Sequence, residues 1–318
     1  SEMCIRDSVR RYPRSAFTLT SKLPTMFLKK EEDMERIFCE QLEKCGVEYF
    51  DYYLLHSLNA AHYEIAERLG GFAFLQKKKM EGRIKKLGFS YHDNAELLDQ
   101  ILTEHPETEV VQLQINYLDW DDQRVQSGKC YETARKHGKE IIVMEPVKGG
   151  TLARLPEQAE QLLKDYAPER SPASWAIRFA ASLDGVLTVL SGMSNFEQLR
   201  DNMSYMKAFV PLKEDEKTVL RKVVSAIRSA ISIPCTGCNY CTVGCPQHIR
   251  IPEYFTLYNA EKRAPSKIIS LQQEYENHTQ NAGKASDCIA CGQCERQCPQ
   301  HIAIIRHLKE IAAIFESK

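Results

Sequence analysis

The chain has 318 residues, of which 43% are hydrophobic and 27% charged, as in a globular protein that buries a core. Its length predicts about two domains. A formal net charge of -1 gives no electrostatic reason to expect nucleic acid or an anionic membrane as a partner, and no apolar run is long enough to span a bilayer.

The first eight residues, SEMCIRDS, are expected to be foreign to the protein. They match no helix or strand pattern, and they reverse-translate codon by codon to the end of a transposase adapter used to prepare sequencing libraries. We therefore leave residues 1–8 out of functional reasoning, and expect the natural protein to continue upstream of Val9. The alternative interpretation is a disordered native start.

From residue 16 to about residue 209, short apolar strands alternate with amphipathic helices, which predicts a parallel sheet. One helical stripe, containing Phe38 and Leu42, ends at Gly46, a residue suited to the left-handed conformation after a helix. Another helix is expected to start with Ser171 as N-cap and Pro172 in its first turn. The predicted strands are 16–22, 50–57, 84–90, 110–116, 141–147 and 185–193.

A closed (β/α)8 barrel needs eight strands, and six are predicted here. We therefore expect residues 9–209 to form an incomplete TIM barrel that lacks its first two β/α units. Cys39 and Cys130 fall in predicted helices of this region and are expected to be packing residues rather than ligands.

Polar residues lie at the ends of the predicted strands, where active sites of such barrels are found. A single polar residue at a strand end is more often part of the core, but several at successive strand ends predict a site. The segment SGMSNFEQLRDN after the last strand could also start a helix whose N–H groups face an anion. The strand-end residues are Lys22, His56, Ser90, Gln112, Asn116 and Glu145.

Residues 210–318 are predicted to form a small α-helical domain. Helices are expected over KEDEKTVLRKVVSAIRSAIS, IPEYFTLYNAEKR, IISLQQEYENH and IAIIRHLKEIAAIFES, with no strand between them. A unit of four cysteines, then PQHI, then a helix occurs twice, which indicates an internal repeat.

The two cysteine runs, CTGCNYCTVGCP and CIACGQCERQCP, each read C-x2-C-x2-C-x3-C-P and hold eight of the twelve cysteines. This spacing is typical of ferredoxin-like iron–sulfur sites. Structural zinc, the alternative ligand, usually takes two C-x2-C pairs that are a dozen or more residues apart. The clustering favours metal in a reducing cytoplasm over disulfides.

In two-cluster ferredoxins the fourth cysteine of one run binds the cluster of the other run. We therefore expect two [4Fe-4S] clusters with exchanged fourth ligands, which would give so small a helical domain much of its core. The first cluster is assigned to Cys235, Cys238, Cys241 and Cys298, and the second to Cys288, Cys291, Cys294 and Cys245.

Six motifs, in this order, resemble those of the aldo/keto reductases: FTLTSKLP, YFDYYLLHSLN, GRIKKLGFSYHD, VQLQINYLDW, MEPVKGG and VLSGMSNFEQLRDN. With the cysteine runs, they resemble the branch of that family that carries a C-terminal dicluster ferredoxin domain. The resemblance covers the chain from about Val9 to its end.

The resemblance implies a nicotinamide cofactor, NAD(H) or NADP(H), and a small carbonyl or alcohol substrate. The catalytic lysine and histidine of the family match Lys22 and His56. The residues that bind the nicotinamide carboxamide match Ser90 and Gln112, and the pair at the adenine end matches Asp201 and Asn202.

The chain also departs from the family's pattern. The catalytic Asp and Tyr lie on the first two β/α units, which this sequence lacks, so this chain by itself is not expected to reduce carbonyls. Met144 stands where the family has an aromatic residue that stacks on nicotinamide. Gly192 and Gln198 stand where cations grip a 2′-phosphate, which favours NADH over NADPH.

In the complete protein, the implied chemistry is hydride transfer, with tyrosine as proton donor, Lys22 lowering its pKa and His56 positioning the substrate oxygen. The clusters are expected to relay single electrons to a ferredoxin or flavoprotein partner. Two alternatives stay open: an electron-transfer module with a degenerate barrel, or clusters that are structural or oxygen-sensing.

Overall fold

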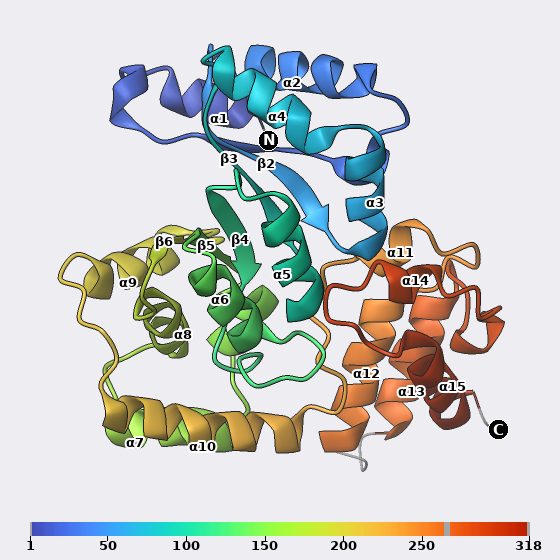
Figure 1. Cartoon of the computed structure of the whole chain (residues 1–318). Helices are drawn as coiled ribbons and strands as arrows, with labels where there is room; N and C mark the ends of the chain where they lie inside the picture. The colour runs from blue at the N-terminus through green and yellow to red at the C-terminus, as the bar shows by residue number, and fades with distance from the viewer. Residues whose placement is uncertain (1, 264–267, 317–318) are drawn as a thin grey trace. The chain divides into compact units, whose positions relative to one another are not determined.

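The computed structural model describes residues 2–263 and 268–316, which divide into two compact units (Figure 1). The first unit comprises Ser1–Ile115, Asp119–Pro146 and Leu183–Ser191. The second comprises Asn116–Leu118, Val147–Ser182 and Gly192–Lys318. Among the described residues, no helix is long and apolar enough to cross a membrane.

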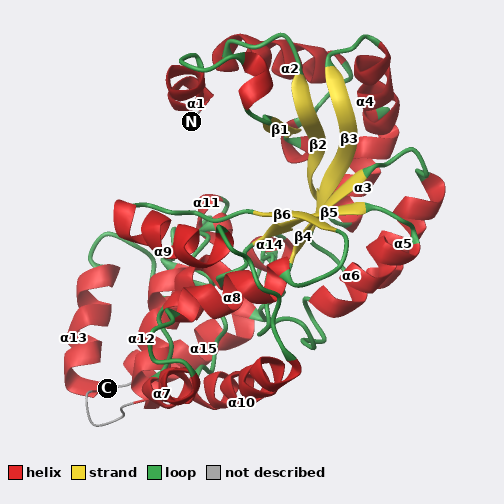
Figure 2. Cartoon of the chain, turned by 90° about the vertical axis from the view of Figure 1, so that its left-hand side faces the viewer, coloured by secondary structure: helices red, strands yellow, loops and turns green. Residues whose placement is uncertain are grey.

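The first unit contains a six-stranded parallel sheet whose strands follow one another in chain order (Figure 2). All six predicted strands are present, and β1 and β6 form the edges of the described sheet. The fourth strand ends earlier than predicted, so Asn116 follows the strand instead of lying in it. The strands are β1 (Thr20–Leu23), β2 (Phe50–Leu58), β3 (Ile84–Tyr91), β4 (Val110–Gln114), β5 (Glu140–Met144) and β6 (Val186–Val189).

Helices connect these strands, as the alternating pattern predicts. The helices of this unit are α1 (Glu2–Val9), which comes before the first strand, α2 (Glu32–Cys45), α3 (Ala60–Arg68), α4 (Gly71–Met80), α5 (Ala95–Glu104) and α6 (Ser127–Lys136). Its 3-10 turns are η1 (Arg14–Ala16) and η2 (Thr25–Phe27). Helix α1 corrects the prediction that residues 1–8 form no element. Arg6 of this helix lies against the backbone of Gly46. This is a tertiary contact, which the local sequence pattern does not reveal.

Helix α2 packs on the sheet through the predicted stripe. The ring of Phe38 packs edge-to-face with Phe50 and with Tyr53, at ring-centroid distances of 5.9 and 4.8 Å. Gly46 ends the helix with φ +67°, as predicted. The prediction that Cys39 is a packing residue was wrong: it lies on the exposed face of α2, where its Sγ is 3.5 Å from Glu35 Oε1. Cys130 in α6 is buried, as predicted.

The second unit is helical. Its helices are α7 (Glu157–Tyr166), α8 (Pro172–Ala181), α9 (Phe196–Met206), α10 (Glu214–Ala230), α11 (Tyr240–Val243), α12 (Ile251–Arg263), α13 (Ile268–Thr279), α14 (Gln293–Arg296) and α15 (Ile304–Phe315), with 3-10 turns η3 (Lys148–Ala153) and η5 (Ala285–Asp287). Ser171 caps α8 by accepting a hydrogen bond from the Ser174 N–H, as predicted.

A buried ion pair joins α8 to α10. Arg178 Nη1 donates to Glu216 Oε1 at 2.7 Å, and both side chains are only 4% exposed. Burial opposes ionisation of Glu216, but hydrogen bonds from Arg178, the Lys213 N–H and Arg170 outweigh it and lower its pKa to about 2. The pair lies beside an apolar core built around Trp175, Leu220 and Val223.

Candidate functional site

Four of the predicted site residues lie on one face of the sheet, toward the carboxyl ends of four successive strands. The strand register pairs Lys22 with Leu54, Leu54 with Gly88, and Ser90 with Gln112. Because side chains alternate along a strand, His56 and Ser90 share the face of Leu54 and Gly88. A Cβ on Gly88 would lie 1.8 Å from the Val110 carbonyl oxygen, so this face has no room for a side chain there.

Lys22 lies close enough to His56 for its charge to act on the imidazole. Burial lowers the pKa of Lys22. Burial, followed by the charges of Lys22 and His62, lowers the pKa of His56 to about 4. The buried Thr25 hydroxyl donates to the His56 carbonyl oxygen at 2.6 Å, and Gln41 of α2 donates to the Lys22 carbonyl at 2.9 Å. The backbones of both residues are thus fixed, and His56 is neutral near pH 7.

Ser90 and Gln112 are buried and are register partners on β3 and β4. Ser90 Oγ accepts the Ser57 N–H at 2.7 Å, so its own O–H can still act as a donor. Gln112 Nε2 donates to Met144 Sδ at 3.1 Å, so its carbonyl oxygen can act as an acceptor. A donor and an acceptor therefore lie next to each other on two strands.

Asp201 and Asn202 lie in α9, in the second unit, and both already have partners. Asp201 accepts the hydroxyl of Ser171, the N-cap of α8, at 2.6 Å, and Asn202 accepts the hydroxyl of Tyr205. Helix α9 starts after Asn195, and Gln198 Oε1 accepts the Ser194 N–H at 2.6 Å just before it.

The eight cysteines of the two runs line two separate cavities of the second unit. Besides cysteines, the first cavity is lined by residues such as Thr236, Phe255, Gln300 and Ile302. Its cysteines are Cys235, Cys238, Cys241 and Cys298, three from the first run and one from the second.

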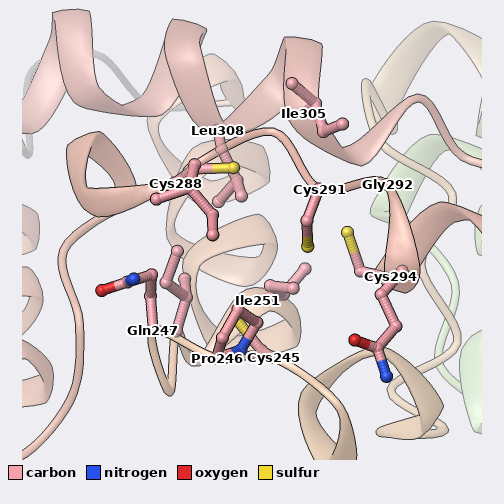
Figure 3. Close-up of a pocket in the computed structure, with 13 residues that line it drawn as sticks. Cys245, Pro246, Gln247, Ile251, Cys288, Cys291, Gly292, Cys294, Ile305 and Leu308 are labelled. Carbon is pink, nitrogen blue, oxygen red and sulfur yellow. The ribbon is translucent and has the colours of Figure 1, made fainter.

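The second cavity is lined by Cys245, Cys288, Cys291 and Cys294, with Ile251 and Leu308 among its apolar residues. Figure 3 shows the sulfur atoms of Cys288, Cys291 and Cys294 around the cavity, with Cys245 beside Pro246 on the opposite side. Within the described ranges, no group of three or more His, Cys, Asp or Glu converges closely enough to hold a single metal ion.

The two runs repeat one another in backbone conformation as well as in sequence. The N–H of the histidine in each PQHI segment donates to the carbonyl of the fourth cysteine of its run, at 3.1 Å in both copies. Three positions in each copy have positive φ: Gly237, Asn239 and His248 in the first, and Ala290, Gly292 and His301 in the second.

Burial raises the pKa of four of the cavity thiols, those of Cys235, Cys241, Cys294 and Cys298. It raises the pKa of Cys235 to about 11, although the Gly237 N–H, 3.4 Å from Cys235 Sγ, acts in the opposite direction. Burial and the neighbouring thiols Cys235, Cys238 and Cys298 raise the pKa of Cys241 to about 12. The thiolate form that binds iron therefore needs a positively charged metal in the cavity. Eight thiols that line two cavities in sets of four fit iron–sulfur clusters.

Comparison with known proteins gives the family. Residues 1–224 match the aldo/keto reductase family, and residues 234–303 match a 4Fe-4S dicluster domain. The chain belongs to the aldo/keto reductase family. It is therefore an oxidoreductase that carries a C-terminal 4Fe-4S dicluster domain, as the motifs predicted. A search of curated proteins returned no match.

Solved aldo/keto reductases share the fold of this family member. A thermostable aldo-keto reductase in complex with the inhibitor epalrestat is 20% identical, with a TM-score of 0.57 over 70% of this chain and 77% of the other. The holo form of an enzyme from Bacillus halodurans is 21% identical, with a TM-score of 0.55 over 70% and 77%. One from Klebsiella pneumoniae, in complex with NADP and acetate, is 18% identical, with a TM-score of 0.52 over 71% and 76%. These likenesses confirm the TIM-barrel-like α/β fold.

Two residues that line the cavities of this aldo/keto reductase were not predicted. Gln300 lines the first cavity and Gln247 the second. Each is the glutamine of a PQHI segment, so the repeat of PQHI after both cysteine runs is the signal that could have revealed them.

Proposed function

We propose that the complete protein is an iron–sulfur oxidoreductase in which nicotinamide-dependent hydride transfer between a carbonyl and an alcohol is linked to one-electron transfer through two [4Fe-4S] clusters. This chain by itself, without the catalytic Asp and Tyr, is not expected to reduce carbonyls. The observation that carries the proposal is that Lys22 and His56 share one sheet face in a chain that also has two four-thiol cavities. Residues 9–209 would form the reductase domain and residues 210–318 the cluster domain.

Each cluster would be bound by the four cysteines that line one cavity. The fourth ligand of each set would then come from the other run, so that both runs must be in place before either cluster is complete. Clusters supply one-electron redox chemistry when bound. The assigned sets are Cys235, Cys238, Cys241 and Cys298 for the first cluster, and Cys288, Cys291, Cys294 and Cys245 for the second.

Lys22 and His56 would act on the substrate oxygen. His56, neutral near pH 7, can donate a hydrogen bond that positions this oxygen without protonating it. The Lys22 ammonium would lower the pKa of a neighbouring proton donor through its positive charge.

Ser90 and Gln112 would hold the carboxamide of the nicotinamide. The Ser90 hydroxyl can donate to the carboxamide oxygen, and Gln112 Oε1 can accept from its nitrogen. Asp201 and Asn202 would hold the adenine end. Gln198 is uncharged and already accepts the Ser194 N–H, which favours NADH over NADPH.

The linkage needs a carrier between the two chemistries. Hydride transfer moves two electrons together, whereas each cluster takes one electron. A flavin, free or in a flavoprotein partner, would supply this carrier chemistry, because flavins take up two electrons with a hydride and give them up one at a time, with release of the proton.

Anaerobic reduction of the cluster-loaded protein tests this function. NADH with a trace of flavin mononucleotide is expected to bleach the visible absorbance of the clusters, and Ser90→Ala or Gln112→Leu is expected to slow this at least tenfold. Lys86→Met is the matched control, because Lys86 lies on the same face of β3 but pairs with Glu140. Bleaching by dithionite but not by NADH or NADPH would rule out the linkage.

A further inference from the structure

Lys148 is a buried cation in the second unit whose role the reductase chemistry does not explain. It stands at the start of η3 and is only 1% exposed. Its ammonium donates a hydrogen bond to Gln300 Oε1, and Gln300 is itself only 2% exposed. Burying a lysine and an amide together is costly unless their polar atoms are satisfied.

The other end of the Gln300 amide has no partner within the described part of the chain. Its Nε2 is buried and makes no hydrogen bond there, and Gln300 lines the first cavity with four cysteines. Because Lys148 can only donate, it fixes the amide oxygen on its own side and leaves the Nε2 hydrogens as donors. An unmet buried donor beside four thiols indicates a sulfur acceptor that is present when the cavity is filled.

The loop that carries Lys148 packs directly on the first cysteine run. A Cβ on Gly149 would lie 2.5 Å from the carbonyl oxygen of Thr236, the residue after Cys235. Lys148 therefore places a positive charge next to Gln300 at the wall of the first cavity.

The second cavity has a different arrangement. Its equivalent glutamine, Gln247, is half-buried, and Figure 3 shows its amide pointing away from the sulfur atoms. The second cavity is also the more open to solvent, since Cys291 is exposed and Ile289 is 61% exposed. The repeat thus places the same residue type at both cavities, but Lys148 orients only Gln300.

We propose that Gln300 and Lys148 are positioning residues that raise the reduction potential of the first cluster above that of the second. Gln300 Nε2 donates a hydrogen bond to a sulfur of the bound cluster, and Lys148 holds the amide and adds positive charge. One-electron reduction makes a cluster more negative, so a donor and a cation beside it stabilise the reduced form. The inference depends on the proposed function, since both cavities must hold clusters.

A redox titration of the anaerobic protein, followed by electron paramagnetic resonance with dithionite as the one-electron reductant, tests this. Two reduction waves are expected. Gln300→Leu is expected to lower the midpoint potential of the upper wave. The expected change is at least tenfold in the reduction equilibrium, which is about 59 mV for one electron. Lys148→Met is expected to lower the same midpoint potential, and Lys148→Arg is expected to keep most of the wild-type value. The control Gln247→Leu is expected to leave this potential unchanged.

The outcomes separate the possible failures. A wild-type protein without clusters would overturn the proposed function, whereas two clusters whose waves do not move in Gln300→Leu would overturn only this inference. If Gln300→Leu loses iron, Gln300→Met, which keeps the length of the side chain, takes its place. Loss of the first cluster in both variants, with Gln247→Leu intact, would show a structural role instead and contradict the proposal.

Discussion

Cys298 lines the same cavity as Cys241, although the two residues belong to different cysteine runs. The second cavity shows the reverse exchange, because Cys245 of the first run lies with Cys294 of the second. Each cavity therefore joins two segments that are far apart in the chain. A cluster bound in either cavity would cross-link the helical domain much as a structural metal does.

The exchange predicts which pairs of cysteine substitutions act together. Cys298→Ala and Cys241→Ala are each expected to lose about half of the bound iron, and the double variant is expected to lose no more, because both residues serve one cluster. Combining Cys298→Ala with Cys294→Ala should remove nearly all iron. Iron analysis after anaerobic purification measures this.

Cys39→Ala provides the control, since Cys39 is exposed on α2 and should leave the iron content unchanged. If the pairing were reversed, with Cys298 and Cys294 acting as one site, the exchanged assignment would be wrong.

His56 is predicted to make stability depend on pH. Its pKa in the folded protein is about 4, below the ordinary value of 6.5, so the unfolded chain binds more protons between these values. Stability is therefore unaffected by His56 above pH 6.5 and falls as the pH drops from 6.5 toward 4. Urea unfolding at pH 5 and pH 7 should show a smaller difference for His56→Gln than for the wild type. An equal difference would mean that His56 titrates normally.

Removing one partner of the Arg178–Glu216 pair should destabilise the second unit strongly. Arg178→Met leaves the Glu216 carboxylate buried without its main partner, so we expect a loss of about 3–5 kcal/mol in the free energy of unfolding. The Glu216 carboxylate contributes to the free energy of unfolding above its ordinary pKa of 4.5, and this contribution is lost as the pH falls toward 2. Denaturant unfolding measures the loss.

Lys217→Gln is the matched control on the same helix. Lys217 pairs with Glu214 at 2.7 Å, but both side chains are exposed, so its loss should cost below about 1 kcal/mol. Similar costs for Arg178→Met and Lys217→Gln would contradict the importance of burial.

Gln198→Arg is expected to shift cofactor preference toward NADPH. A guanidinium near the start of α9 can form an ion pair with a 2′-phosphate. The neutral amide of Gln198 cannot form such a pair. Calorimetric titration with both nucleotides should show NADPH binding at least tenfold tighter relative to NADH than in the wild type. A wild-type protein that already prefers NADPH would show that other cations bind the phosphate.

The strands and most helices could be predicted because their apolar residues follow regular periods. Phe38 and Leu42 in α2, for example, face the sheet at helical spacing. Helix α1 could not be predicted, because it is short and its contact between Arg6 and Gly46 forms only in the folded protein. Cys39 was misjudged because the helix was predicted correctly but not the face on which this residue lies.

The placement of the cysteines in two sets of four and of Lys22 on β1 was predictable, because the cysteine runs repeat and Lys22 lies in a recognisable motif. Their roles stay predictions. The pairing of Lys148 with Gln300 was not predictable, because it joins two loops 152 residues apart in the chain. Neither residue stands at a spacing that indicates the other, and only the folded second unit brings them together.

Iron and acid-labile sulfide content after anaerobic purification tests the central claim most directly. Two [4Fe-4S] clusters predict a coloured protein with about eight iron atoms and about eight sulfides per chain. A colourless protein that contains zinc and lacks acid-labile sulfide would contradict it.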